Sequence, residues 1–240
     1  MLTDRRRFDN LAFMPRARRQ FVGGFVYHVL NRANGRLRIF RKRSDFEAFE
    51  RVLAEGVERV GMRICGYCIM GNHWHLLLWP QGDGDVSEFM QWITLTHTQR
   101  WHAAHGTAGI GHVYQGRFKS FPVESNEHYL TVLRYIESNP LRAGLVENSR
   151  EWEYGSLAIR NGADKDGLRI DGGPVAVPRR WNSLVNVLPS ESVDAAIGRC
   201  IMRGCPFGSE AWIAAAAEKC GLESTLRPRG RPKKVPGTFS

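Results

Sequence analysis

The spacing of hydrophobic residues changes repeatedly along the N-terminal two thirds of the chain. Period-two alternation predicts strands, as in the aromatic and β-branched segment FVYHVLNR at residues 25–32. Apolar residues three and four positions apart predict helices, as in residues 44–60, where we expect Ser44 to be the N-cap. In chain order the predicted elements are a strand at 25–32, a helix at 44–60, strands at 63–70 and 73–79, a helix at 87–105, a strand at 113–123 and a helix at 126–138.

This order of elements predicts an α+β fold with a ferredoxin-like (RRM-like) antiparallel sheet and helices on one face. The rest of the chain has a different character, with Gly, Asp and Pro clusters followed by a helical pattern. We expect a basic N-terminal arm at 1–20, the sheet domain at 21–160, a loop or linker at 161–188, a small helical appendage at 189–224 that binds DNA, and a disordered basic tail at 225–240.

Charge is concentrated at the two ends of the chain. The 34 Lys and Arg residues outnumber the 24 Asp and Glu residues, so the net charge is +10. Residues 1–43 hold twelve basic and two acidic side chains, and residues 227–240 hold five basic and no acidic ones. Basic blocks of this kind favour a polyanionic partner, most commonly nucleic acid. Solvated tails that keep the protein soluble are the alternative.

Composition excludes several broad classes of protein. Hydrophobic residues make up 42% of the chain, which is enough to form a core and argues against general disorder. The longest apolar runs, such as residues 76–79, are far shorter than the roughly 18 residues of a membrane span. Five cysteines, an odd number, argue against a disulfide framework. We therefore expect a cytoplasmic, nucleoid-associated protein with no membrane segment.

Two histidines separated by one residue are the first candidate for chemistry. His73 and His75 lie in a predicted strand, where residues i and i+2 point to the same face, while Trp74 between them points into the core. Both imidazoles can therefore reach one divalent ion. Two neutral histidines on a polar sheet face are the alternative for this spacing alone.

A second candidate lies on the last predicted helix of the sheet domain. Tyr135 and Asn139 are four residues apart and share a helix face, approximately so because Pro140 follows Asn139. A tyrosine hydroxyl beside a metal ion can attack phosphorus and form a covalent phosphotyrosine. Without a metal partner, Tyr135 would be an ordinary residue at the edge of the core.

Four segments together resemble the HuH single-strand DNA transposases (IS200-like), most closely their REP-associated tyrosine transposase branch. These segments are YHVLNR at 27–32, CIMGNHWHLLL at 68–78, GRFKS at 116–120 and RYIESNPLRAGLV at 134–146. They occur in the family's order and span roughly residues 20–160. One departure is Gly71, which stands in the turn before the two histidines where the family usually has proline.

The resemblance implies a mechanism and a set of site residues. By similarity, His73 and His75 bind Mg²⁺ or Mn²⁺, Tyr135 is the nucleophile and Asn139 helps to hold the metal. The implied reaction is cleavage and rejoining of single-stranded, hairpin-bearing repeat DNA through a 5′-phosphotyrosine, with a free 3′-OH. Further DNA contacts are expected from basic or amide side chains on or beside the sheet, namely Asn31, Arg32, Arg117 and Lys119. Residues on a solvated sheet edge are the alternative.

The C-terminal tail resembles an AT-hook, with Arg229, Gly230, Arg231 and Pro232 as its core. Such a segment would lie in the narrow minor groove of A·T-rich duplex DNA, whereas a generic basic tail is the alternative. Two functions remain open at this stage, the transposase and a non-catalytic regulator derived from one that binds repeat hairpins. Monomer and dimer are both compatible with the sequence.

The other cysteines and histidines carry no convergent pattern. Cys65 and Cys68 have zinc-like spacing, but residues three apart in a strand face opposite sides, so we expect buried thiols. The remaining histidines are expected to be ordinary core or surface residues, at positions 28, 97, 102, 105, 112 and 128.

Overall fold

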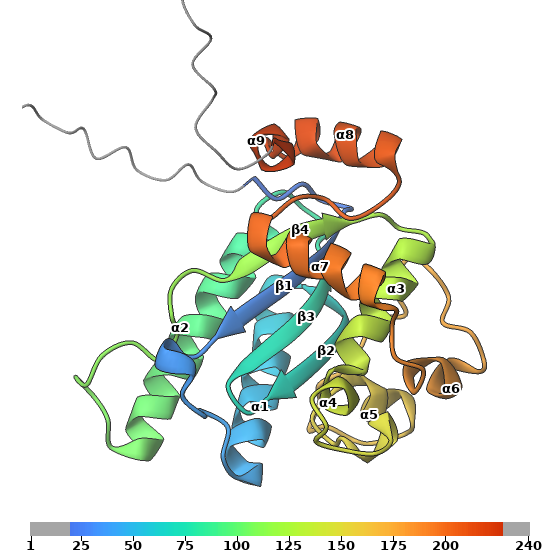
Figure 1. Cartoon of the computed structure of the whole chain (residues 1–240). Coiled ribbons are helices and arrows are strands. Elements are labelled where there is room, and N and C mark those ends of the chain that lie inside the picture. The colour runs from blue at the N-terminus through green and yellow to red at the C-terminus, as the bar shows by residue number, and fades with distance from the viewer. Residues whose placement is uncertain (1–19, 228–240) are drawn as a thin grey trace, which may run out of the picture.

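The computed structural model describes residues 20–227 and contains a four-stranded antiparallel sheet with helices packed against it (Figure 1). The strands are β1 (Val26–Arg32), β2 (Arg63–Met70), β3 (His73–Trp79) and β4 (Lys119–Val123). Their order in the sheet is β2-β3-β1-β4, with every neighbouring pair antiparallel. This is the order that a β-α-β-β-α-β chain adopts in a ferredoxin-like sheet, so the predicted α+β class is confirmed.

Helices cover both faces of the sheet, and the expectation that they lie on one face is wrong. The helices are α1 (Arg43–Val60), α2 (Asp85–His105), α3 (Glu127–Glu137), α4 (Asn139–Arg142), α5 (Ser156–Arg160), α6 (Trp181–Val185), α7 (Glu191–Arg203), α8 (Glu210–Lys219) and α9 (Glu223–Leu226). One hydrophobic core joins the sheet to α1 and α2, and a second joins the opposite face to α3, α6 and α7 (Figure 1).

The second helical layer follows from the sequence of β3, which carries apolar residues on both faces, Leu77 sharing the α3 side with the two histidines. Trp74 and Leu76 pack in the core under α1 and α2, while Leu77 packs in the core under α3. A strand that is apolar on both sides needs cover on both sides. Helix α7 and its neighbours supply part of that cover from a region expected to be an appendage.

Two element boundaries differ from the expected ones for local reasons. Helix α1 begins at Arg43, and its first turn is capped by the Asp45 carboxylate, which accepts hydrogen bonds from the backbone N–H of Arg41 and Lys42 at 2.9 and 3.2 Å. Ser44, the expected cap, therefore lies inside the helix. The Asp45 side chain reaches back to donors that the helix itself leaves unpaired.

Strand β4 is shorter than the predicted strand at 113–123. Tyr114 forms only an isolated bridge with Ala33 at the end of β1. The chain then leaves the sheet at Gly116, whose φ of 153° interrupts the strand, and returns at Lys119. The segment between the two pairings borders a large cavity described below.

The C-terminal third packs against the sheet domain. Residues 161–188, expected as a loop or linker, contain α6, whose Trp181 is buried in the core under α3. In the region 189–224, Ser190 caps α7 by accepting a hydrogen bond from Val193 N, and Ile197 is buried against the sheet. Residues 1–19 of the arm expected at 1–20, and residues 228–240 of the tail expected at 225–240, lie outside the described residues, and the latter hold the AT-hook-like core. The first two residues of the expected tail belong to α9.

Two further expectations concern membrane helices and cysteines. None of the helices in residues 20–227 is long and apolar enough to span a bilayer. All five cysteines are buried free thiols, and burial was expected for Cys65 and Cys68. Cys65 and Cys68 nevertheless lie in the same core, because a bulge between Ile64 and Gly66 shifts the alternation of β2.

A buried polar chain fixes Trp74 on the α1 and α2 side of the sheet. The indole N–H of Trp74 donates to the Tyr114 hydroxyl at 3.0 Å, and that hydroxyl lies 2.6 Å from Nδ1 of His97 on α2. Burial lowers the pKa of His97 to about 3. Trp74, the residue between the two candidate histidines, is thus held in place through the Tyr114 hydroxyl by the neutral imidazole of His97.

His97 makes the stability of the protein sensitive to acid. An unfolded chain protonates His97 below pH 6.5, but the native chain does so only near pH 3, so the free energy of unfolding falls as pH decreases between these values. We expect His97→Asn to reduce this slope by about 1.4 kcal/mol per pH unit between pH 6 and 4.5. Urea unfolding at several pH values measures the slope, and the exposed His112→Asn is the control. An unchanged slope in His97→Asn would contradict the assignment.

Candidate functional site

His73 and His75 point to the same face of β3, as the sequence predicts. Their ring centroids are 5.2 Å apart, and Trp74 lies between them on the opposite face, fully buried. Across the sheet, His73 is opposite Arg32 of β1, and His75 is opposite Leu30. The face that carries the histidines is the one covered by α3.

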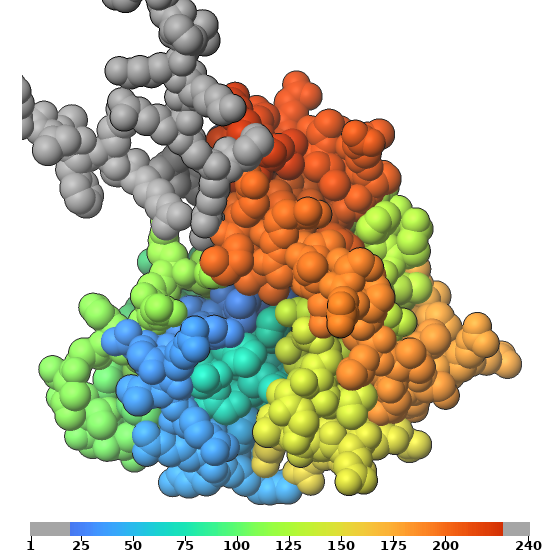
Figure 2. Space-filling view, viewed as in Figure 1, coloured from blue at the N-terminus to red at the C-terminus, as the bar shows by residue number. Residues whose placement is uncertain are grey.

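Helix α3 brings Tyr135 to this face. The Tyr135 ring centroid lies 5.9 Å from that of His75, with the rings edge to face, and 8% of the residue is exposed. The helix can approach β2 closely because residue 66 is glycine, since a Cβ at this position would overlap Leu133 Cδ1. Figure 2 shows teal surface from the β2 and β3 region at the front of the molecule, between blue and yellow segments and below orange α7. Tyr135 and the two histidines therefore form one cluster from two elements that are distant in sequence.

Asn139 is tied to the nucleophile candidate through the main chain. It is the first residue of α4, which follows α3 after Ser138, and it is 7% exposed. Its Nδ2 donates to the carbonyl oxygens of Tyr135 at 2.9 Å and Ile136 at 3.4 Å. These bonds use the amide nitrogen, which leaves Oδ1 as the atom that can act as a ligand.

A cation that our sequence reasoning missed lies on Tyr135. The guanidinium carbon of Arg142, from α4, is 4.3 Å from the centre of the Tyr135 ring. Arg142 also forms a 2.8 Å ion pair with Asp194 of α7. This contact links the proposed appendage directly to the residue expected to be the nucleophile.

Burial keeps the histidines of the cluster neutral at physiological pH. It lowers the pKa of His73 to about 4, with a further contribution from the charge of Arg32. Burial also lowers the pKa of His75 well below its usual value, and the nearby His28, His73 and Arg142 act in the same direction. Neutral imidazole is the form that binds metal ions, so burial favours the form that a metal site would need.

The hydrogen bond of His73 fits a divalent cation. His73 Nδ1 lies 2.6 Å from Asn72 Oδ1. A carbonyl oxygen can only accept, so Nδ1 of His73 carries the proton and its Nε2 keeps a lone pair. No group of three or more His, Cys, Asp and Glu side chains within residues 20–227 is arranged to hold a metal. If a metal ion binds at His73 and His75, any third protein ligand would be of another residue type, for which the Asn139 amide is the expected candidate.

The expected DNA contacts fall into two groups. Arg32 lies on the histidine face, and its Nε is buried with no hydrogen-bond partner among the described residues. Lys119 starts β4 opposite Leu30, and its Nζ lies 3.4 Å from Met202 Sδ. Asn31 and Arg117 instead line a cavity of about 1150 Å³ on the α2 side. The structure thus separates these four residues into two places.

His28 is the other residue that sequence reasoning missed. Its Nε2 lies 2.9 Å from Nδ1 of His75, and it is 1% exposed. Alternation along β1 places His28 on the same face as Arg32, so the pairing of β1 with β3 was the signal that connects it to His75. No comparable signal existed for Arg142, because its position depends on how α4 folds back.

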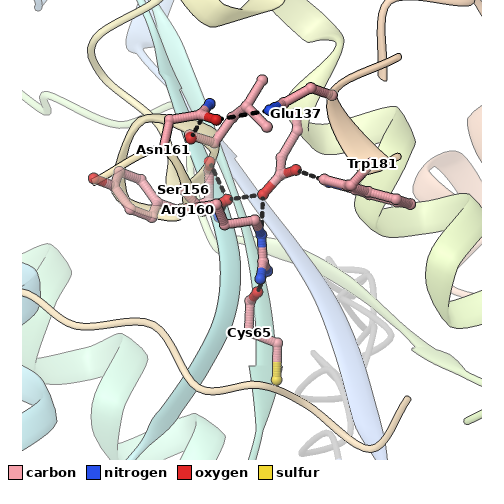
Figure 3. Close-up of polar contacts among 9 residues, drawn as sticks. Cys65, Glu137, Ser156, Arg160, Asn161 and Trp181 are labelled. Carbon is pink, nitrogen blue, oxygen red and sulfur yellow. Dashed lines mark hydrogen bonds and ion pairs between the residues drawn. The ribbon is translucent and has the colours of Figure 1, made fainter. Parts of the chain in front are cut away.

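A buried carboxylate holds the end of α3 in place. Glu137, two residues after Tyr135, accepts hydrogen bonds from Ser156 Oγ at 2.5 Å, Arg160 Nε at 2.9 Å and Trp181 Nε1 at 2.5 Å (Figure 3). Arg160 also donates to the backbone oxygen of Cys65 on β2 at 2.6 Å. The network therefore ties α3 to α5, α6 and the sheet.

Comparison with known proteins finds one matching family and, separately, similar solved structures. The family described as IS200-like transposases matches residues 21–139. A REP-associated tyrosine transposase bound to a REP hairpin has a similar structure, with a TM-score of 0.50 and 18% identity over 66% of this chain and 96% of that one. A candidate transposase from Deinococcus radiodurans aligns over 62% of this chain and 97% of that one, with 16% identity and a TM-score of 0.37. No curated protein matches the chain.

The network around Glu137 predicts a large loss of stability when its charge is removed. In Glu137→Gln an amide N–H₂ must lie against one of three donors, and Arg160 loses its ion pair. We expect the free energy of unfolding to fall by about 3–5 kcal/mol in a urea titration. The control on the same helix is Glu127→Gln, whose side chain is 80% exposed and which should cost under about 0.5 kcal/mol. Equal losses in the two variants would contradict this role for Glu137.

Proposed function

Since the chain belongs, through residues 21–139, to the IS200-like transposase family, we propose that it cleaves and rejoins single-stranded DNA that carries hairpins. The observation that carries this proposal is the position of Tyr135 on α3, 5.9 Å between ring centroids from His75 on β3. A tyrosine hydroxyl beside two neutral histidines is suited to phosphoryl transfer.

In the proposed reaction, Tyr135 is the nucleophile. Its hydroxyl oxygen attacks the scissile phosphorus, the bond from phosphorus to the 3′ oxygen breaks, and the phenol proton ends on that oxygen. The products are a 5′-phosphotyrosine and a free 3′-OH. Rejoining is the reverse attack by this or another 3′-OH, and no further energy source is needed because the phosphodiester bond is exchanged and not hydrolysed.

We propose Mg²⁺ or Mn²⁺ as the cofactor, held by His73, His75 and Asn139. A divalent cation supplies positive charge at the phosphate oxygens, which makes phosphorus easier to attack. The support for this set is that Nε2 of His73 and Oδ1 of Asn139 remain available once their internal hydrogen bonds are made.

Cationic side chains around Tyr135 suit a phosphate backbone. Arg142 contacts the Tyr135 ring, and Arg32 lies on the same sheet face, so both are proposed to bind phosphates next to the scissile bond. Lys119, which starts the edge strand β4, would extend this row of phosphate-binding side chains. Asn31 and Arg117 would contact DNA separately, from the cavity beside α2.

The proposed substrate is repeat DNA that folds into hairpins. A structurally similar transposase is bound to a REP hairpin, and we extend that substrate class to this chain. The AT-hook-like residues Arg229, Gly230, Arg231 and Pro232 are proposed to add contacts to A·T-rich duplex. A DNA substrate of this kind would place the protein at the nucleoid.

Removing the Tyr135 hydroxyl tests the proposal. We expect Tyr135→Phe to lower the cleavage rate of a labelled hairpin oligonucleotide by at least about a thousandfold, since the nucleophile is lost, with binding nearly intact. The matched control is Tyr129→Phe, on the same helix, whose buried hydroxyl has no hydrogen-bond partner among the described residues.

Cleavage and binding are measured separately, by denaturing gels and by fluorescence anisotropy. Undiminished cleavage by Tyr135→Phe would contradict the proposal. Tight hairpin binding by the unaltered protein with no cleavage, in Mg²⁺ or in Mn²⁺, would instead favour the non-catalytic regulator.

A further inference from the structure

The hydrogen bond between His28 and His75 joins two buried imidazoles on neighbouring strands. Nε2 of His28 and Nδ1 of His75 are 2.9 Å apart, and the residues are 1% and 3% exposed. Burial in an apolar core disfavours the charged form of both rings. A hydrogen bond between two neutral imidazoles contains a single proton, which can belong to either ring.

Which of the two rings carries that proton decides whether His75 can bind a metal ion. If Nδ1 of His75 carries the proton and donates it, Nε2 of His75 keeps its lone pair. If His28 donates, Nε2 of His75 carries a proton and cannot be a ligand. His73 does not face this ambiguity, because its partner Asn72 offers an oxygen that only accepts.

The surroundings of His28 show that packing alone does not account for a histidine at this position. Its second nitrogen, Nδ1, is buried without any hydrogen-bond partner in the described part of the chain. Its ring stacks on Phe121, with centroids 4.7 Å apart. An unpaired buried polar group destabilises the fold, whereas a phenylalanine would fill the same apolar space without this cost.

We propose that His28 is a positioning residue, which accepts a hydrogen bond from Nδ1–H of His75 and so holds His75 in the tautomer that can bind a divalent cation. This inference rests on the metal site of the proposed function. Partners of this kind orient a metal-binding imidazole, and their loss typically weakens metal binding by about 10–100-fold. The unpaired Nδ1 of His28 then lowers the stability of the fold, and this loss is offset by the orientation that His28 gives to His75.

Two substitutions separate this role from packing. His28→Phe keeps the ring and removes the acceptor, while His28→Gln keeps an amide oxygen at about the reach of the imidazole Nε2. With Mn²⁺ as the probe, titrated by electron paramagnetic resonance, we expect His28→Phe to bind about 10–100-fold more weakly. His28→Gln should remain much closer to the unaltered protein, and His28→Phe should melt at the same or a higher temperature.

The tautomer is observed directly by NMR. Long-range ¹H–¹⁵N correlations of the full-length protein saturated with Mg²⁺ should show the proton of His75 on Nδ1. Unchanged Mn²⁺ affinity in His28→Phe, or a His75 proton on Nε2, would overturn the inference.

His73→Ala keeps this failure distinct from failure of the proposed function. If His73→Ala weakens Mn²⁺ binding and His28→Phe does not, only the role of His28 is wrong. If neither substitution weakens Mn²⁺ binding, the metal site itself is wrong, and the inference falls with it.

Discussion

The position of the candidate nucleophile depends on one buried carboxylate. Glu137 lies between Tyr135 and Asn139, and its two oxygens accept from three side chains on α5 and α6. Burying a carboxylate is costly unless every lone pair is used, so the surrounding donors and the end of α3 have to come together as a unit. Through Arg160 the same network reaches the main chain of β2, next to the strand that carries the histidines. The C-terminal region thus helps to hold the site together.

In the candidate site, neutral imidazoles and charged guanidinium groups occupy different positions. The imidazoles of His73 and His75 are kept neutral by burial, whereas the positive charges of Arg32 and Arg142 lie at their edge and lower the pKa of His75 further. Neutral nitrogen ligands suit a cation, and guanidinium groups suit phosphate. The arrangement suits the proposed phosphoryl transfer, although most of the net charge of the chain lies near its ends.

Local patterns predicted the strands that carry the histidines. The resemblance to a family then singled out Tyr135 as the expected nucleophile. Period-two alternation placed Trp74 opposite its two neighbours, and the structure agrees. What the patterns missed depends on contacts between distant segments. The second helical layer, the Glu137 network and the stacking of Arg142 on Tyr135 all need α4 to α7 to fold back on the sheet. His28 was dismissed because its partner is 47 positions away and becomes visible only when β1 is paired with β3.

The central claim is that Tyr135 forms a covalent bond with DNA, and mass spectrometry tests it most directly. The unaltered protein is incubated with Mg²⁺ or Mn²⁺ and a hairpin oligonucleotide whose 3′-OH fragment is too short to remain annealed, so that rejoining is prevented. Digestion by nuclease and trypsin should then yield the peptide containing Tyr135 with a nucleotide attached through its 5′ phosphate to the phenol oxygen. Cleaved DNA with an adduct on a different residue, or with no adduct, would contradict the account.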